Sequence, residues 1–187
     1  QKLISRIIVQ AKKNPKRVVF AEAENHKILK AAQIVAEEGI AYPILLGRKH
    51  KIDKICEEHS IELPDCQIID AYAEEEKRAE FGEILFQKRQ RKGVTKYQAR
   101  KLMRDRNYFA AMMLEQDEAD AMISGLTKDY PKTIRPALEV IGREEGVKKV
   151  AGMYLMLSKK GPFALADTTV NKNPTSQSSN VLYFSID

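Results

Sequence analysis

Short apolar runs alternate with longer amphipathic stretches along the first three quarters of this chain. The short runs are typical of strands, and the longer stretches repeat apolar residues at helical spacing. The expected strands are residues 17–20, 42–47, 66–70 and 121–123. The expected helices lie at the start of the chain, before Gly39, at 52–60, 74–92, 95–104 and 107–116, and after Asp129. This alternation predicts an α/β layer fold with a mostly parallel sheet and helices on both faces.

The pattern changes after Gly146. Two apolar segments, 147–157 and 162–170, flank the turn 158–161 and predict an antiparallel β-hairpin. We therefore expect an α/β domain over residues 1–146 and the incomplete start of a second domain over 147–187. A segment of about 40 residues seldom forms a core of its own.

The middle of the chain contains the strongest candidate for a binding site. Residues 121–123 resemble a strand covered on both faces, and Ser124 and Gly125 end it. Asp129 is a good N-cap and Pro131 suits the first turn of the helix that follows. Free backbone N–H groups are expected to point from this helix start toward the strand end and to attract an anion there.

Three further residues complete this candidate phosphate or substrate site, which includes Ser124 and Gly125. Thr127 and Lys128 lie in the loop, and Arg135 lies one turn into the helix, where its side chain leans toward the helix start. An ordinary strand-turn-helix with a solvated arginine explains the same residues. The pattern assigns no catalytic residue.

The net charge of +6 suits either acidic small molecules or nucleic acid. The densest basic stretch, 87–92, ends a helix that opens with glutamates at 74–76, an order that complements the helix dipole. Aromatic residues do not interleave this stretch, so we expect no nucleic-acid binding. The chain also lacks an apolar run of about 18 residues, so we expect a globular cytoplasmic protein with no membrane partner.

The remaining polar candidates have ordinary explanations. Cys56 and Cys66 have no zinc-type spacing and are expected to be reduced structural thiols, so no metal site is expected. Glu22 and Glu24 follow the first strand, where they would either face a cleft or cap the next helix. Solvated or structural roles are expected of the histidines, which are His26, His50 and His59.

Six separated blocks of this sequence resemble the phosphate acetyl/butyryltransferase family. They occur in the family's order, at 16–24, 29–47, 107–109, 124–125, 134–138 and 171–175. Within that family, residues 126–131 look most like the phosphotransacetylase-like domain at the C-terminus of multifunctional NADP-dependent malic enzymes. The chain begins without a methionine, as expected of a piece of a longer protein.

The resemblance implies a two-domain α/β fold of the isocitrate-dehydrogenase-like type, a homo-oligomer, and a cleft for an acyl-CoA and an acyl phosphate. Arg135 matches an arginine that steadies the phosphate, and Ser124 and Thr127 match the loop beside it. The block that contains Asn171, Asn173, Pro174 and Thr175 would either contact coenzyme A or shape a turn. The serine, arginine and aspartate that assist thiol attack in the family have no counterpart here, and residues 176–187 do not continue the expected helix.

The function expected from this resemblance is regulatory binding of acetyl-CoA within a malic enzyme. Malate decarboxylation, with its NADP and divalent metal, would then belong to a part of the protein outside this chain. One alternative is an active phosphate acetyltransferase, which converts acetyl-CoA and phosphate to acetyl phosphate and CoA. The other is a non-enzymatic module that binds anions or nucleic acid.

Overall fold

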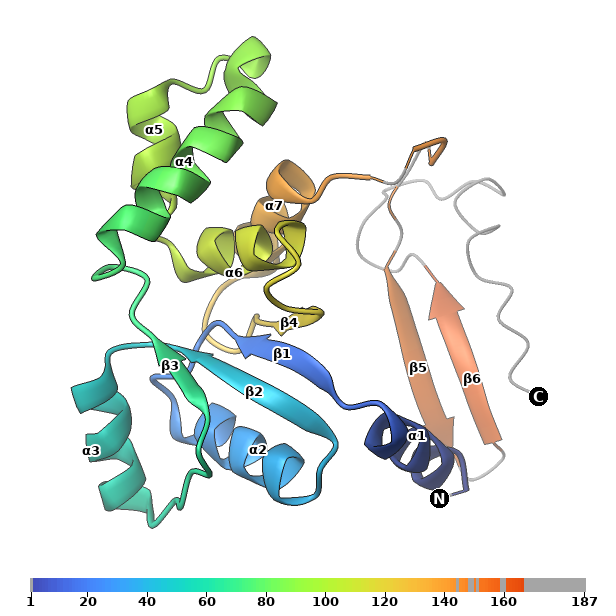
Figure 1. The fold of residues 1–187 in the computed structure, drawn as a ribbon. Coiled ribbons are helices and arrows are strands. Elements are labelled where there is room, and N and C mark those ends of the chain that lie inside the picture. Colours follow the sequence, from blue (N-terminus) through green and yellow to red (C-terminus); the bar gives the residue numbers. More distant parts are fainter. Residues whose placement is uncertain (1, 144, 148–149, 151, 159–160, 167–187) are drawn as a thin grey trace. The chain divides into compact units, whose positions relative to one another are not determined.

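The structure is a computed structural model that describes residues 2–143, 145–147, 150, 152–158 and 161–166. The chain divides into two compact units, Gln1–Gly142 and Arg143–Asp187. The first contains a four-stranded parallel sheet in the order β3-β2-β1-β4 (Figure 1). Its strands are β1 (Lys16–Phe20), β2 (Ala41–Leu46), β3 (Gln67–Ile69) and β4 (Ala121–Ile123).

Helices occupy the stretches between these strands. They are α1 (Lys2–Lys13), α2 (His26–Glu37), α3 (Lys49–His59), α4 (Glu75–Arg89), the 3-10 turn η1 (Gln90–Lys92), α5 (Lys96–Leu102), α6 (Arg106–Glu115) and α7 (Tyr130–Val140). Most begin where the sequence predicts. Helix α3 begins at Lys49 rather than at Ile52, because its first turn is basic and exposed and so carries no apolar signal.

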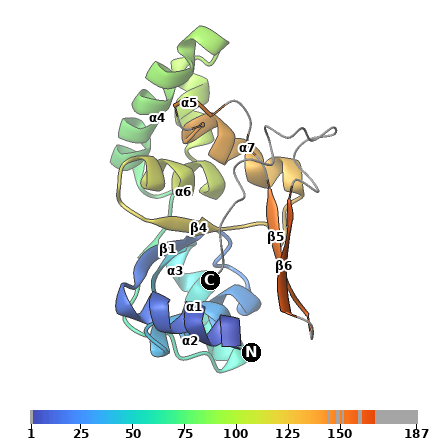
Figure 2. The ribbon, with the colours of Figure 1, turned by 90° about the vertical axis from the view of Figure 1, so that its right-hand side faces the viewer.

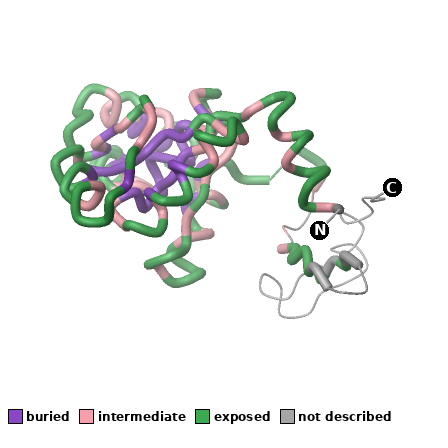
Figure 3. Tube along the Cα trace, turned by 90° about the horizontal axis from the view of Figure 1, so that it is seen from below, coloured by how far each residue is buried: buried purple, intermediate pink, exposed green. Residues whose placement is uncertain are grey.

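Helices cover both faces of the sheet, which confirms the predicted α/β architecture (Figures 1 and 2). Alternate residues of a strand point to opposite faces. Val19 and Leu46 therefore pack in the larger core with α4, α5 and α6, whereas Phe20 and Leu45 pack in the smaller core with α2 and α3. Figure 3 shows the buried segments gathered where these layers meet.

Strand β4 differs from its predicted environment. It pairs only with β1 and forms one edge of the described sheet, and Ile123 is 48% exposed. The prediction of a strand covered on both faces is therefore wrong at Ile123, whereas Ala121 and Met122 are half-buried. An apolar run this short carries no sign of whether the strand lies in the middle or at the edge of its sheet.

The second unit contains the predicted hairpin. Strands β5 (Met153–Ser158) and β6 (Gly161–Ala166) pair antiparallel, with Met153 opposite Ala166. That residues 147–187 are the start of a second domain stays a prediction.

Candidate functional site

The loops after β1 and β4 meet at the carboxyl end of the sheet. From β1 the chain moves outward to β2 and β3, then returns through α4, α5 and α6 to β4 on the other side of β1. Ligands of open parallel sheets bind outside the strand ends at such a switch point. The amide of Ala21 donates to the carbonyl of Ile123 across this point at 3.1 Å, so the two loops begin in contact.

The buried carboxylate of Glu22 binds the loop that follows β4. Its Oε2 accepts from the amides of Gly125 and Leu126 at 2.7 and 2.8 Å, and its Oε1 accepts from the amide of Thr127 at 2.8 Å and from the Thr127 hydroxyl. Burial raises the pKa of Glu22, but the hydrogen bonds from Thr127 and the amides together outweigh it and lower the pKa below its ordinary value. The prediction of free amides at the helix start after Asp129 stays a prediction, but the three loop amides before it are not free. The chain's own carboxylate occupies them.

Ser124 is held in the same network. Its hydroxyl donates to Oδ1 of Asn107 at 2.8 Å and lies 3.5 Å from Oε2 of Glu22. Asn107 is fully buried near the start of α6, and its Nδ2 has no hydrogen-bond partner among the described residues. Ser124 thus ties the end of β4 to α6.

A pocket of about 390 Å³ opens beside this network. Its walls come from the loop after β1, from the start of α6 and from the loop after β4. Thr127 and Lys128 contribute to it from the last of these, Arg106 from the second, and Arg104 from the turn between α5 and α6. We call it the strand-end pocket. Both signs of charge line it, since Glu22, Glu24 and Asp105 are also present.

Ion pairs hold most of the charges around the strand-end pocket. Lys128 Nζ lies 2.7 Å from Oδ2 of Asp105, and Glu24 binds both Arg48 and Arg106. The hydrogen bond from Arg48 is the largest cause that lowers the pKa of Glu24 to about 2, and Arg106 adds to it. Arg104 differs, because it has no ion-pair partner in the described part of the chain.

The family model for phosphate acetyl/butaryl transferase matches residues 2–182. The chain belongs to this family. Among its relatives, phosphate acetyltransferase of Helicobacter pylori is 35% identical over 89% of the chain, and that of Clostridium acetobutylicum is 33% identical over 93%. The chain spans 32% and 54% of these two relatives.

Solved structures of phosphotransacetylases have the same fold. One from Streptococcus pyogenes superposes with a TM-score of 0.82 at 28% identity, and EutD phosphotransacetylase from Staphylococcus aureus with 0.80 at 26%. These matches cover 95% and 94% of the chain and 54% of each solved chain. The described sheet and helices are therefore part of the phosphotransacetylase fold.

The structure brings together only some of the residues that the sequence predicts for this family's site. Thr127 and Lys128 line the strand-end pocket, and Ser124 and Gly125 bind behind it to Asn107 and Glu22. Arg135 is exposed on α7 and is not one of the pocket's lining residues. Four residues predicted to contact coenzyme A lie outside the described residues. They are Asn171, Asn173, Pro174 and Thr175.

Arg135 instead lies near a buried tyrosine. The Tyr108 hydroxyl donates to Oε2 of Glu139 at 2.6 Å. Burial, followed by this bond to Glu139, raises the pKa of Tyr108, while the positive charge of Arg135 opposes the rise. The role of Arg135 as a phosphate-binding residue stays a prediction.

The sequence leaves the acidic half of the site undecided, because it allows Glu22 and Glu24 either to face a cleft or to cap α2. In the structure both glutamates line the strand-end pocket, and Asn25 caps α2 by accepting from the amide of Lys27. The available signal was their position directly after β1, at the sheet edge where β4 also ends. Arg104 and Arg106 were missed because the pattern shows them only as polar residues between two helices.

Proposed function

We propose that the protein containing this chain is a phosphate acetyltransferase that exchanges an acetyl group between coenzyme A and phosphate. The observation that carries the proposal is the similarity to proteins of that name, at 33% identity over 93% of the chain for the Clostridium acetobutylicum relative. The arginine and lysine side chains that line the strand-end pocket support it, because phosphate and acyl phosphate are anions. Assembly as a homo-oligomer and a cytoplasmic location belong to the same proposal. No helix among the described residues is long and apolar enough to cross a membrane.

In the direction of acetyl-CoA formation, the thiol sulfur of coenzyme A would attack the carbonyl carbon of acetyl phosphate. The bond from that carbon to the phosphate oxygen would break, and phosphate would leave as hydrogen phosphate, which carries the proton lost by the thiol. Side chains that neutralise the leaving phosphate lower the barrier. Because Glu22 occupies the loop amides, we assign this role to side chains, namely Lys128 and Arg106 in the pocket and Arg135 on α7.

The test is acetyl phosphate formation from acetyl-CoA and phosphate by the full-length protein and its Arg135→Ala variant. We expect the substitution to lower the rate by about 10²- to 10³-fold, as removal of one charge-stabilising group does at other sites. Arg91→Ala, which removes an exposed arginine from η1, is the matched control and should leave the rate unchanged. An unchanged rate in Arg135→Ala would remove Arg135 from this role. A parent protein that forms no acetyl phosphate would refute the proposed function.

The second candidate is a regulatory acetyl-CoA-binding domain of an NADP-dependent malic enzyme. Its support is the segment 126–131, together with the commitment of the loop amides to Glu22 rather than to a substrate. The relatives quoted above are named phosphate acetyltransferases, so they favour the catalytic function. Under the regulatory alternative, NADP and a divalent metal would bind in a part of the protein outside this chain.

A further inference from the structure

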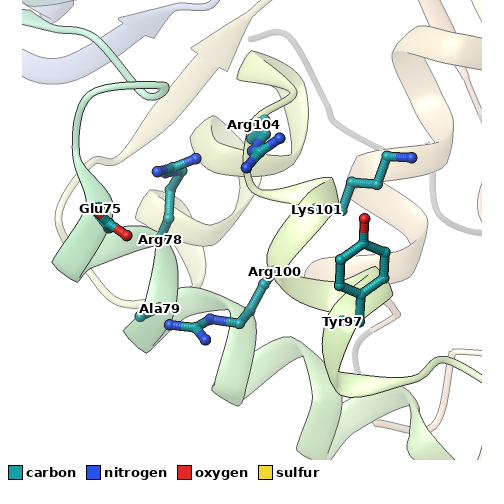
Figure 4. Close-up of a pocket in the computed structure, with 7 residues that line it drawn as sticks. All are labelled: Glu75, Arg78, Ala79, Tyr97, Arg100, Lys101 and Arg104. Carbon is teal, nitrogen blue, oxygen red and sulfur yellow. The ribbon is translucent and has the colours of Figure 1, made fainter.

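A second pocket lies between α4 and α5. It measures about 230 Å³, and four basic side chains line it together with Tyr97 and Glu75 (Figure 4). The basic residues are Arg78 from α4, Arg100 and Lys101 from α5, and Arg104 from the turn after α5. We call this space the α4–α5 pocket.

Close packing of the two helices brings these charges together. Gly82 of α4 lies against Arg100, and a Cβ built on Gly82 would be only 2.9 Å from the Arg100 Cα. The Arg100 side chain therefore starts at the surface of α4 and extends across it (Figure 4). The absence of a side chain at Gly82 thus fixes one wall of the α4–α5 pocket.

The charges in the α4–α5 pocket are not balanced. The lining includes four cations and a single carboxylate, that of Glu75, although the charge of Arg100 also acts on Glu83 outside the lining. Within the described residues, none of the four makes an ion pair, whereas Lys128 and Arg106 in the strand-end pocket both do. Like charges held together repel each other, and a bound anion would offset that repulsion.

Arg78 and Arg104 carry the strongest indication of a ligand. Both guanidinium groups lie over the ring of Tyr72, at 5.4 and 5.3 Å from its centroid. In Figure 4 the two groups point toward one another, while Lys101 points away. The Nε of Arg78 is buried and has no hydrogen-bond partner among the described residues. Buried donors in folded proteins are nearly always paired, so an acceptor is expected here, as it is at Arg89 Nε and Asn107 Nδ2, which are also unpaired among the described residues.

We propose that the α4–α5 pocket binds a small phosphate-type anion through Arg78, Arg100 and Arg104. A planar guanidinium donates two parallel hydrogen bonds to phosphate oxygens, and Arg78 has such a donor unpaired. The pocket is smaller than the roughly 300–1,000 Å³ of sites that enclose drug-sized ligands. Its occupant is therefore orthophosphate or the phosphate group of a metabolite whose remainder stays outside.

Arg104 couples this anion to the strand-end pocket, because its side chain lines both pockets. A ligand that draws the Arg104 guanidinium into the α4–α5 pocket removes one cation from the other. The anion is thus expected to weaken phosphate binding at the strand ends, and each site affects the other to the same extent.

The experiment is titration of the full-length protein with sodium phosphate at constant ionic strength, followed by NMR of the arginine Nε–Hε groups. We expect saturable shifts of Arg78, Arg100 and Arg104. In Arg100→Gln and Arg78→Gln, the phosphate dissociation constant derived from the surviving pocket arginines should rise at least about tenfold, as expected for the loss of one charged donor. Arg91→Gln is the control for general loss of charge and should bind like the parent.

A second arm identifies the source of the phosphate. Glycerol phosphate that binds more tightly than orthophosphate assigns the site to a phosphorylated metabolite, and equal or weaker binding assigns it to free phosphate. If Arg78→Gln does not fold by circular dichroism, Arg100→Gln decides alone, because its side chain is exposed. Binding unchanged in Arg100→Gln, or shifts that chloride reproduces, would overturn the proposal. Arg135→Gln distinguishes this proposal from the proposed function. The variant should slow acetyl transfer and leave the phosphate-induced shift of the Arg78 Nε–Hε group intact.

Discussion

Glu22 shapes the loop after β4 although it lies 103 residues before Gly125 in the chain. Its contacts illustrate which residue roles are predictable from sequence. Thr95 and Asp129 cap their helices through partners three residues away, and sequence spacing predicted both. The partners of Glu22 are distant, and no local pattern indicates them. Sequence alone therefore left undecided the role of Glu22, which is the side chain that organises the site.

Glu22→Gln should destabilise the fold. An amide group replaces the charged acceptor, and its NH₂ would face the N–H donors of the loop. We expect the free energy of unfolding to fall by about 1 to 3 kcal/mol at pH 7, measured by urea denaturation. Glu62→Gln, at an exposed loop position, is the control and should change it little.

The same variant should show a defined pH dependence. Because folding lowers the pKa of Glu22 from 4.5, its stabilising effect is fully present above about pH 4.5 and is lost as the pH falls through the lower folded-state value. The stability difference between parent and Glu22→Gln should therefore shrink in acid. A difference that stays constant from about pH 7 to 3 would show that the charge of Glu22 does not stabilise the loop.

The helices and strands themselves were largely predictable, but the contacts between them were not. The capping box at Thr95 and the helical spacing of Phe81 and Leu85 in α4 are visible in the sequence, and both helices are present. Nothing in the pattern showed that α5 packs on Gly82 or that β4 is an edge strand. Both features depend on which helices and strands become neighbours in the fold, and short apolar runs in the sequence do not specify those neighbours.

Gly82→Ala tests the contact between α4 and α5. The new methyl group would lie 2.8 Å from the Arg100 Cγ and 2.9 Å from its Cα, so α5 must move. Overpacking of this kind costs about 1 to 3 kcal/mol, whereas the gain in helix propensity is at most about 1 kcal/mol. We expect a net loss of stability in urea denaturation. Glu80→Ala, at an exposed position of α4, is the control, and a stabilised Gly82→Ala would contradict the close contact.

For the whole molecule, the alternation of elements predicted an α/β sheet but not its strand order. The order β3-β2-β1-β4 creates the switch point, and it became visible only in three dimensions. The family resemblance was correct because several separated blocks occur in register, which one motif alone would not establish. The finer assignment to a malic enzyme depended on one short turn, and the quoted relatives do not support it.

Catalysis and regulation can be separated by adding acetyl-CoA to the full-length protein with and without phosphate. A phosphate acetyltransferase should release free coenzyme A thiol only when phosphate is present, which a thiol reagent measures. Isothermal titration without phosphate should show acetyl-CoA binding in either case. Binding without thiol release would favour the regulatory domain, and no heat at millimolar acetyl-CoA would contradict both functions.

The Glu22 carboxylate holds the amides of Gly125, Leu126 and Thr127 in place before any substrate binds. This loop is already ordered in the folded protein, so binding of a metabolite carries no entropy cost for ordering it. Thr127 and Lys128 are thereby preorganised, and affinity at the sheet edge depends on side-chain charge rather than on closure of a loose segment.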